Sequence, residues 1–130
     1  MKKTLSLLLA LLISAALLSA CTTREPSVYG TYARRNSDGS IFTITLHEDG
    51  SYQYYESMLS SHIGVGSYTY ENNTVTIVDD QIPGVSGSLT ITLVFSFENG
   101  NLIFCAEESD RFMYINLPDG AEFVPLDRLG

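Results

Sequence analysis

The sequence predicts an all-β protein, a single small antiparallel meander barrel of about eight strands. Three observations predict it. After residue 28, apolar and polar side chains alternate with a period of two, which is typical of strands with one buried face. Short sequences rich in Asp, Asn and Gly separate these runs, and no stretch keeps a helical period for three turns. Because tight turns join antiparallel neighbours, eight such strands form a meander that can close and remove its edges.

The first four strands are expected in the first half of the region after residue 28. They span residues 29–35, 41–47, 51–57 and 64–71. In the fourth, Gly66, Tyr68 and Tyr70 alternate with smaller residues that face the other way. The segment 57–62 is expected to be a loop.

The other four strands are expected at residues 74–79, 88–98, 101–106 and 112–117. The run 88–98 is the clearest, because every second residue is large and apolar: Leu89, Ile91, Leu93, Phe95 and Phe97. Asp49-Gly50 and Asn99-Gly100 are dipeptides of primed turns and predict hairpins on either side of them. An eight-stranded barrel is either filled by side chains or holds one small ligand. The inward residues are large, so we expect a mostly filled, lipocalin-like barrel with at most a shallow mouth pocket.

Residues 1–20 have the composition of a lipoprotein signal peptide. Lys2 and Lys3 precede an apolar run of about fourteen residues, which is short for a membrane-spanning helix. Leu18-Ser19-Ala20-Cys21 resembles the bacterial lipobox, in which the cysteine receives a diacylglycerol and the chain is cleaved before it. We therefore expect lipidation of Cys21, which makes membrane lipid the first partner and leaves Cys105 as a small buried thiol without a disulfide.

The expected organisation is a signal peptide at 1–20, an acylated tether at 21–28, a barrel at 29–126 and a tail at 127–130. The chain after residue 20 has five arginines, no lysine and fifteen acidic residues, a formal charge of −10. This charge argues against nucleic-acid binding, which needs cations for the phosphates. We expect the protein on the outer face of the cell membrane, and Thr22 leaves outer-membrane sorting open if the host has two membranes.

Candidate catalytic and metal-binding residues are few. His47 and His62 are the only histidines, and neither has the spaced partners of a zinc site, so both are expected in exposed positions. Acidic clusters occur at Asp79-Asp80 and at Glu107-Glu108, and they lack the pattern of a calcium loop. We expect solvated acidic loops, no cofactor, no metal and no enzyme activity. The alternative is a small hydrolase that uses these carboxylates.

Tyrosines gather on two successive strands that are expected to pair, which places them on adjacent ladders. They are Tyr52, Tyr54, Tyr55, Tyr68 and Tyr70. Because consecutive residues point to opposite faces, Tyr54 and Tyr55 cannot both be inside. Exposed tyrosine is favoured at interfaces, so these residues are a candidate contact surface. The alternative is that tyrosine serves here only as a good strand former with a polar tip.

The stretch from Tyr52 to Phe123 carries a resemblance. Its most specific parts are LSSHIGVGSY at 59–68 and DGAEF at 119–123. It resembles a small β domain of clostridial-type lipoproteins, similar to the extracellular C-terminal domain of BlaR/MecR-like membrane metallopeptidases. The metallopeptidase motif is absent, because His47-Glu48 is not followed by the second histidine. The resemblance implies a fold and a location, but no activity.

These observations favour a non-catalytic binding module for an envelope protein, another envelope component or a small ligand. A structural accessory subunit of a membrane complex is the main alternative.

Overall fold

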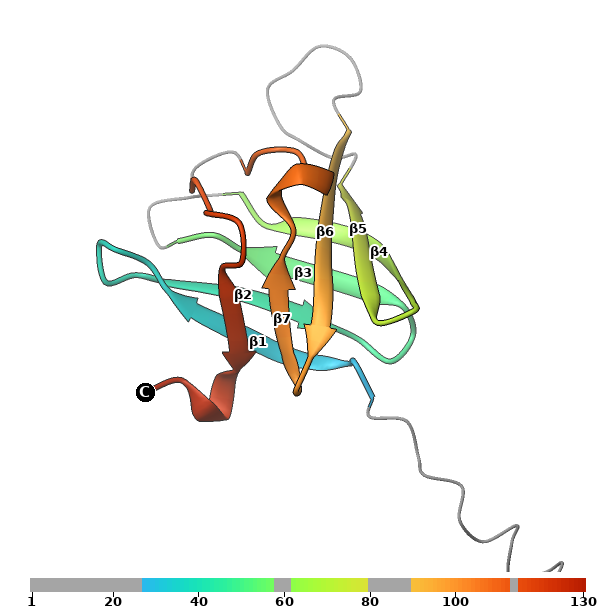
Figure 1. Cartoon of the computed structure of the whole chain (residues 1–130), viewed down its shortest axis with the longest axis horizontal. Helices are drawn as coiled ribbons and strands as arrows, with labels where there is room; N and C mark the ends of the chain where they lie inside the picture. Colours follow the sequence, from blue (N-terminus) through green and yellow to red (C-terminus); the bar gives the residue numbers. More distant parts are fainter. Residues whose placement is uncertain (1–26, 58–61, 80–89, 113–114) are drawn as a thin grey trace, which may run out of the picture.

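The computed structural model describes residues 27–57, 62–79, 90–112 and 115–130. Its eight strands close into one barrel in which each strand pairs with its neighbour in the sequence, and β1 pairs with β8 (Figure 1). Two short 3-10 helices follow β7 and β8. The elements are β1 (Gly30–Arg35), β2 (Ile41–Leu46), β3 (Ser51–Tyr55), β4 (Gly64–Glu71), β5 (Thr74–Asp79), β6 (Ile91–Glu98), β7 (Asn101–Phe104), η1 (Ala106–Glu108), β8 (Glu122–Pro125) and η2 (Leu126–Arg128).

The predicted fold class is confirmed, and seven of the eight predicted strands lie where the alternation places them. The eighth prediction is wrong: residues 112–117 were expected to be a strand, but the closing strand is β8. Phe112 and Leu117 are buried, which explains the apolar pattern there. The chain returns alongside β7 only later, where the N–H of Gly120 donates to the carbonyl of Phe104 at 2.8 Å.

The hairpin turns follow two designs. Asn72 and Asn73, like Asn99 and Gly100, have positive φ at both central positions, as primed turns require. At Asp49-Gly50 only the glycine has positive φ, so this turn is not of the primed type expected. Instead, the Asp49 carboxylate accepts hydrogen bonds from the Ser51 N–H and hydroxyl, and Asp38 repeats this arrangement with Ser40 in the β1–β2 turn.

Aromatic rings fill the barrel, as expected from the large inward residues. Phe42 lies at the centre, with ring centroids 5.0 Å from Phe112 and 5.1 Å from Phe123. Phe95 continues the packing 5.5 Å from Phe104. These edge-on and tilted arrangements suit the quadrupoles of the rings.

Two glycines in β4 make room for two tyrosines of β3. Tyr54 is paired with Gly64 and Tyr52 with Gly66, and the two tyrosine rings stack 6.1 Å apart. A Cβ at residue 64 would lie 2.1 Å from the Tyr54 ring, and one at residue 66 would lie 3.0 Å from the Tyr52 ring. The Gly-Val-Gly sequence therefore lets the tyrosine rings lie against the backbone of β4.

Candidate functional site

One end of the barrel is where the described chain begins, and we call it the tether end. The β2–β3, β4–β5 and β6–β7 turns lie at this end, together with the start of β1 and the end of β8 (Figure 1). Aromatic side chains close it. Phe97 lies edge-on to Tyr32 at 6.4 Å and to Tyr70 at 5.9 Å. The Tyr68 hydroxyl donates to the carbonyl of His47 at 2.7 Å, which ties this group to the β2–β3 turn.

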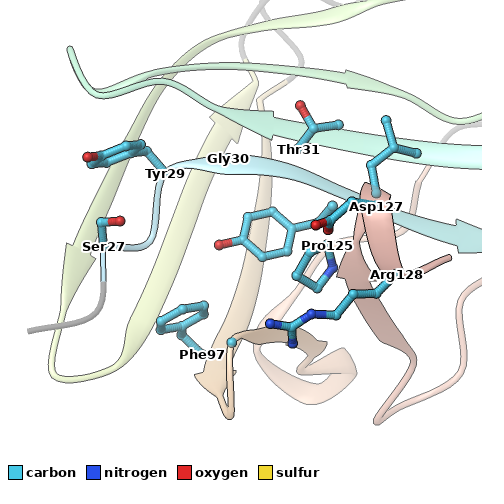
Figure 2. Close-up of a pocket in the computed structure, with 11 residues that line it drawn as sticks. Ser27, Tyr29, Gly30, Thr31, Phe97, Pro125, Asp127 and Arg128 are labelled. Atoms are coloured by element: carbon cyan, nitrogen blue, oxygen red, sulfur yellow. The ribbon is translucent and has the colours of Figure 1, made fainter.

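A groove of about 610 Å³ lies against this aromatic closure (Figure 2). Figure 2 shows Ser27 and Tyr29 on one side and Phe97 on the other, with the Arg128 side chain extending along the groove. Its lining residues are Ser27, Tyr29, Gly30, Thr31, Tyr32, Phe97, Gly100, Pro125, Leu126, Asp127 and Arg128. Tyr29 and Leu126 are each 47 % exposed. The groove therefore presents apolar side chains to solvent beside a guanidinium group.

Tyr32 forms part of the groove and is itself buried. Its hydroxyl donates to the carbonyl of Val28 at 2.6 Å. Burial raises the pKa of Tyr32 to about 12, and the neighbouring Tyr68 and Tyr70 add to this. The phenol therefore stays protonated at neutral pH, so Tyr32 contributes a neutral, fixed surface to the groove.

Exposed acidic side chains surround the tether end. They lie in its three turns and in η2: Glu48, Asp49, Glu71, Glu98 and Asp127. Within the described part of the chain, Arg128 is the cation at this groove. Carboxylate side chains and the Arg128 guanidinium thus lie side by side around the tether end.

The outer face of β2–β5 is a second surface, which we call the neutral wall. Its outward residues are Ile41, Thr43, Thr45, Ser51, Gln53, Tyr55, Val65, Ser67, Thr69, Thr74, Thr76 and Val78. None of these carries a charge. Glu71, the last residue of β4, shares their outward parity and pairs with Thr74, so it is the one charged side chain on this face of the four strands. Val65 and Val78 are 41 % and 43 % exposed, and Val78 pairs with Ser67, diagonally across from Val65.

At the end of the barrel opposite the tether end, a polar cluster is buried. The Tyr54 hydroxyl donates to Asp79 Oδ2 at 2.7 Å, and His62 Nε2 lies 3.2 Å from the same oxygen. Asp79 is fully buried and His62 is nearly so, which contradicts the expectation that both are exposed. Burial and the hydrogen bond to Asp79 raise the pKa of Tyr54. The cluster joins the end of β5 to the residue two positions before β4.

Glu56 is a fourth buried polar residue here, and sequence reasoning missed it. Its carboxylate accepts a hydrogen bond from the Ile115 N–H at 2.9 Å, and its carbonyl accepts one from the Asn36 side chain. The sequence does indicate its burial. Side chains alternate between the two faces of a strand, so residue 56 is expected on the same face as residues 52 and 54. The same parity rule places Asp79 with Val75 and Ile77 on the inner face.

The tyrosine surface expected from the sequence is divided by the structure. Tyr52 and Tyr54 are buried, because their parity faces the interior, so the expectation that they are exposed for contact is wrong. Tyr68 and Tyr70 also face inward and are half-buried at the tether end. Tyr55 alone of the five lies on the neutral wall. A role in an interface stays a prediction.

The acidic residues of the hydrolase alternative lie on different sides of the barrel wall. Asp79 is inside, whereas Glu107 and Glu108 are exposed on η1, and Asp80 lies outside the described residues. His47 is exposed in its turn, as expected. Cys105 is half-buried rather than buried, and its thiol faces the carbonyl of Ile103.

The predicted signal peptide and Cys21 also lie outside the described residues. Within the described part of the chain, no helix is long and apolar enough to span a bilayer, and no three metal-ligating side chains come together. Comparisons with family models, curated proteins and solved structures found no match. The class of protein is therefore defined by its fold, an eight-stranded antiparallel meander barrel.

Proposed function

We propose that this protein is a membrane-anchored extracytoplasmic lipoprotein, and that its barrel is a non-catalytic module that binds an envelope protein through the neutral wall. The anchor is Cys21 in its lipobox-like setting. The observation that carries the proposal is the scarcity of charge on the outer face of four adjacent strands, β2–β5, where Glu71 at the end of β4 is the one charged side chain, in a chain whose formal charge is −8.

Protein interfaces are depleted in charged side chains at their centre and enriched in tyrosine. The neutral wall shares the depletion of charge, and it carries Tyr55, Val65 and Val78 among threonines and serines. Threonine and serine can hydrogen-bond with a partner, yet they lose little side-chain entropy when they are buried. A protein surface is therefore a better match for this wall than a charged polymer.

The filled interior also supports external binding. Phe42, Phe95 and Phe123 are fully buried at the centre of the barrel, in the place where a ligand carrier holds its ligand. A small ligand would thus need an outer surface or the tether-end groove. A structural accessory subunit would use the same wall, and it differs from a binding module only in forming a permanent complex.

A photo-reactive amino acid placed at Val65 or Thr76 tests the wall in the host cell. We expect one discrete cross-linked product from each position, because both side chains project outward from the wall. The matched controls are Ile103 and Glu122, which pair across β7 and β8 and project from the other side of the barrel. The product should be lost when Gln53→Lys is introduced, because an unpaired charge at an interface is costly.

Equal cross-linking from wall and control positions would contradict a specific wall interface. To separate the two roles, the complex is isolated under mild conditions: a stoichiometric, stable complex indicates the accessory subunit, and a dissociable one the binding module. The hydrolase alternative predicts a loss of function when Asp80, Glu107 and Glu108 are changed to amides together, a change that leaves the wall intact.

A further inference from the structure

We propose that the tether end of the barrel rests on the membrane, with Tyr29, Leu126 and Arg128 in contact with zwitterionic phospholipid headgroups. This inference rests on the proposed acylation of Cys21. It goes beyond that proposal because it fixes which end of the barrel faces the lipid and which residues touch it.

The first argument is the length of the chain between the anchor and the groove. Ser27 lines the groove and is only six residues after Cys21. Even a fully extended chain of six residues spans only about 21 Å. An acylated Cys21 therefore holds the groove within that distance of the lipid, whereas the opposite end of the barrel is farther away.

The second argument is the side chains that this end exposes. The described residues include five exposed large apolar side chains: Tyr29, Ile63, Val65, Val78 and Leu126. Tyr29 and Leu126 are the two that line the groove. Figure 2 shows the Arg128 side chain extending along it. Tyrosine and arginine suit the interfacial layer, because their apolar parts can enter it while their polar ends stay hydrated.

The third argument is charge. A guanidinium can pair with the phosphate of a headgroup. The acidic side chains around the mouth, such as Glu98 and Asp127, would be repelled by anionic lipids but attracted by an ammonium group. A zwitterionic phospholipid offers both charges, so it complements this end better than an anionic lipid does.

The chain contains no tryptophan, so a single introduced tryptophan reports on one position. The experiment uses the full acylated protein in phosphatidylcholine vesicles whose acyl chains carry bromine, a contact quencher, close to the headgroup. Tryptophan replaces Tyr29 in one variant and Leu126 in another. Val65→Trp is the matched control, because residue 65 is similarly exposed but lies at the far end of β4. Thermal melting confirms that each variant is folded.

We expect a fractional loss of fluorescence roughly twofold larger or more at positions 29 and 126 than at position 65. Replacing part of the lipid with phosphatidylglycerol at low salt should reduce the loss at both positions. Equal loss at all three positions, loss at position 65 alone, or stronger loss in the anionic vesicles would overturn the inference. Loss at position 65 alone would leave the groove to another occupant, such as a protein segment, whereas stronger loss in the anionic vesicles would indicate an anionic headgroup.

The mass of the purified protein and its flotation with vesicles keep the two proposals separate. If Cys21 is not acylated, the anchoring itself fails. If the protein is acylated and floats but the tryptophans at positions 29 and 126 are not quenched, only the orientation fails.

Discussion

The barrel has a tyrosine half and a phenylalanine half. The described tyrosines all lie in or just before β1–β5, whereas four of the six phenylalanines lie in β6–β8 (Figure 1). In the tyrosine half, hydroxyl groups reach fixed acceptors, such as Val28 for Tyr32 and Asp79 for Tyr54. In the phenylalanine half, Phe95, Phe104 and Phe123 pack against other phenylalanine rings, and Phe97 packs against Tyr32 and Tyr70. The difference teaches that the core rings of one half contribute by packing alone, whereas those of the other half also form hydrogen bonds through hydroxyl groups that can titrate.

The largest expected effect is in the phenylalanine half. Phe95 is fully buried between Phe104 and Phe123. Phe95→Ala should lower the free energy of unfolding by about 4 kcal/mol, because it removes a ring and leaves a cavity. Chemical denaturation at pH 7 and pH 10 measures it, and the loss should be the same at both. A loss of stability that differs strongly between the two pH values would contradict the distinction between the tyrosine half and the phenylalanine half.

The next effect is in the tyrosine half, where two glycines on one strand provide an internal control. A Cβ at Gly64 would meet the Tyr54 ring at 2.1 Å, so Gly64→Ala should cost about 3 kcal/mol of stability. Gly66→Ala meets the Tyr52 ring at 3.0 Å and should cost about 1 kcal/mol. Urea denaturation of both variants gives the difference.

Equal costs for the two variants would mean that the tyrosine rings adjust freely. In that case the tyrosine half would be less tightly packed than the phenylalanine half.

Sequence patterns predicted the hairpins well because alternation and turn chemistry are local. The boundaries of β4 and β5 agree with the prediction, since each strand is framed by turn residues such as Asn72 and Asn73. β8 was missed because barrel closure is decided by pairing with β1 and β7, which are distant in the sequence. Phe112 gave an equally good apolar pattern but is buried without belonging to a strand.

The candidate surfaces were harder to predict. Asp79 and His62 are polar residue types, which suggested exposure, whereas the alternation of side chains along the strands places both on the inner face. Asp79 follows Val75 and Ile77 on the inner face, and the buried Tyr54 hydroxyl meets it there. The groove was outside the reach of pattern reasoning, because it combines the start of β1, the β6–β7 turn and η2. The neutral wall could be recognised only after the strand register showed which residues of β2–β5 face outward.

The last prediction concerns the pH sensitivity of the tyrosine half. In an unfolded chain the pKa of tyrosine is about 10, and burial raises the pKa of Tyr32 to about 12. The folded state therefore favours the protonated phenol. The stability from this preference is complete below pH 10 and is lost as the pH rises from about 10 to about 12. On the order of 2 kcal/mol is involved.

Denaturation of the wild type and of Tyr32→Phe between pH 8 and pH 11.5 measures this term. The wild type should lose more stability than the variant over the upper part of that range, because phenylalanine has no proton to release. At pH 8 the variant lacks the hydrogen bond to Val28 and should be less stable by about 1 kcal/mol. Because the extra loss of the wild type is larger than this difference, the two stability curves should converge as the pH rises and cross before pH 11.5. Parallel curves would show that Tyr32 ionises without cost in the folded state, and the proposed distinction between the two halves would then rest on Tyr54 alone.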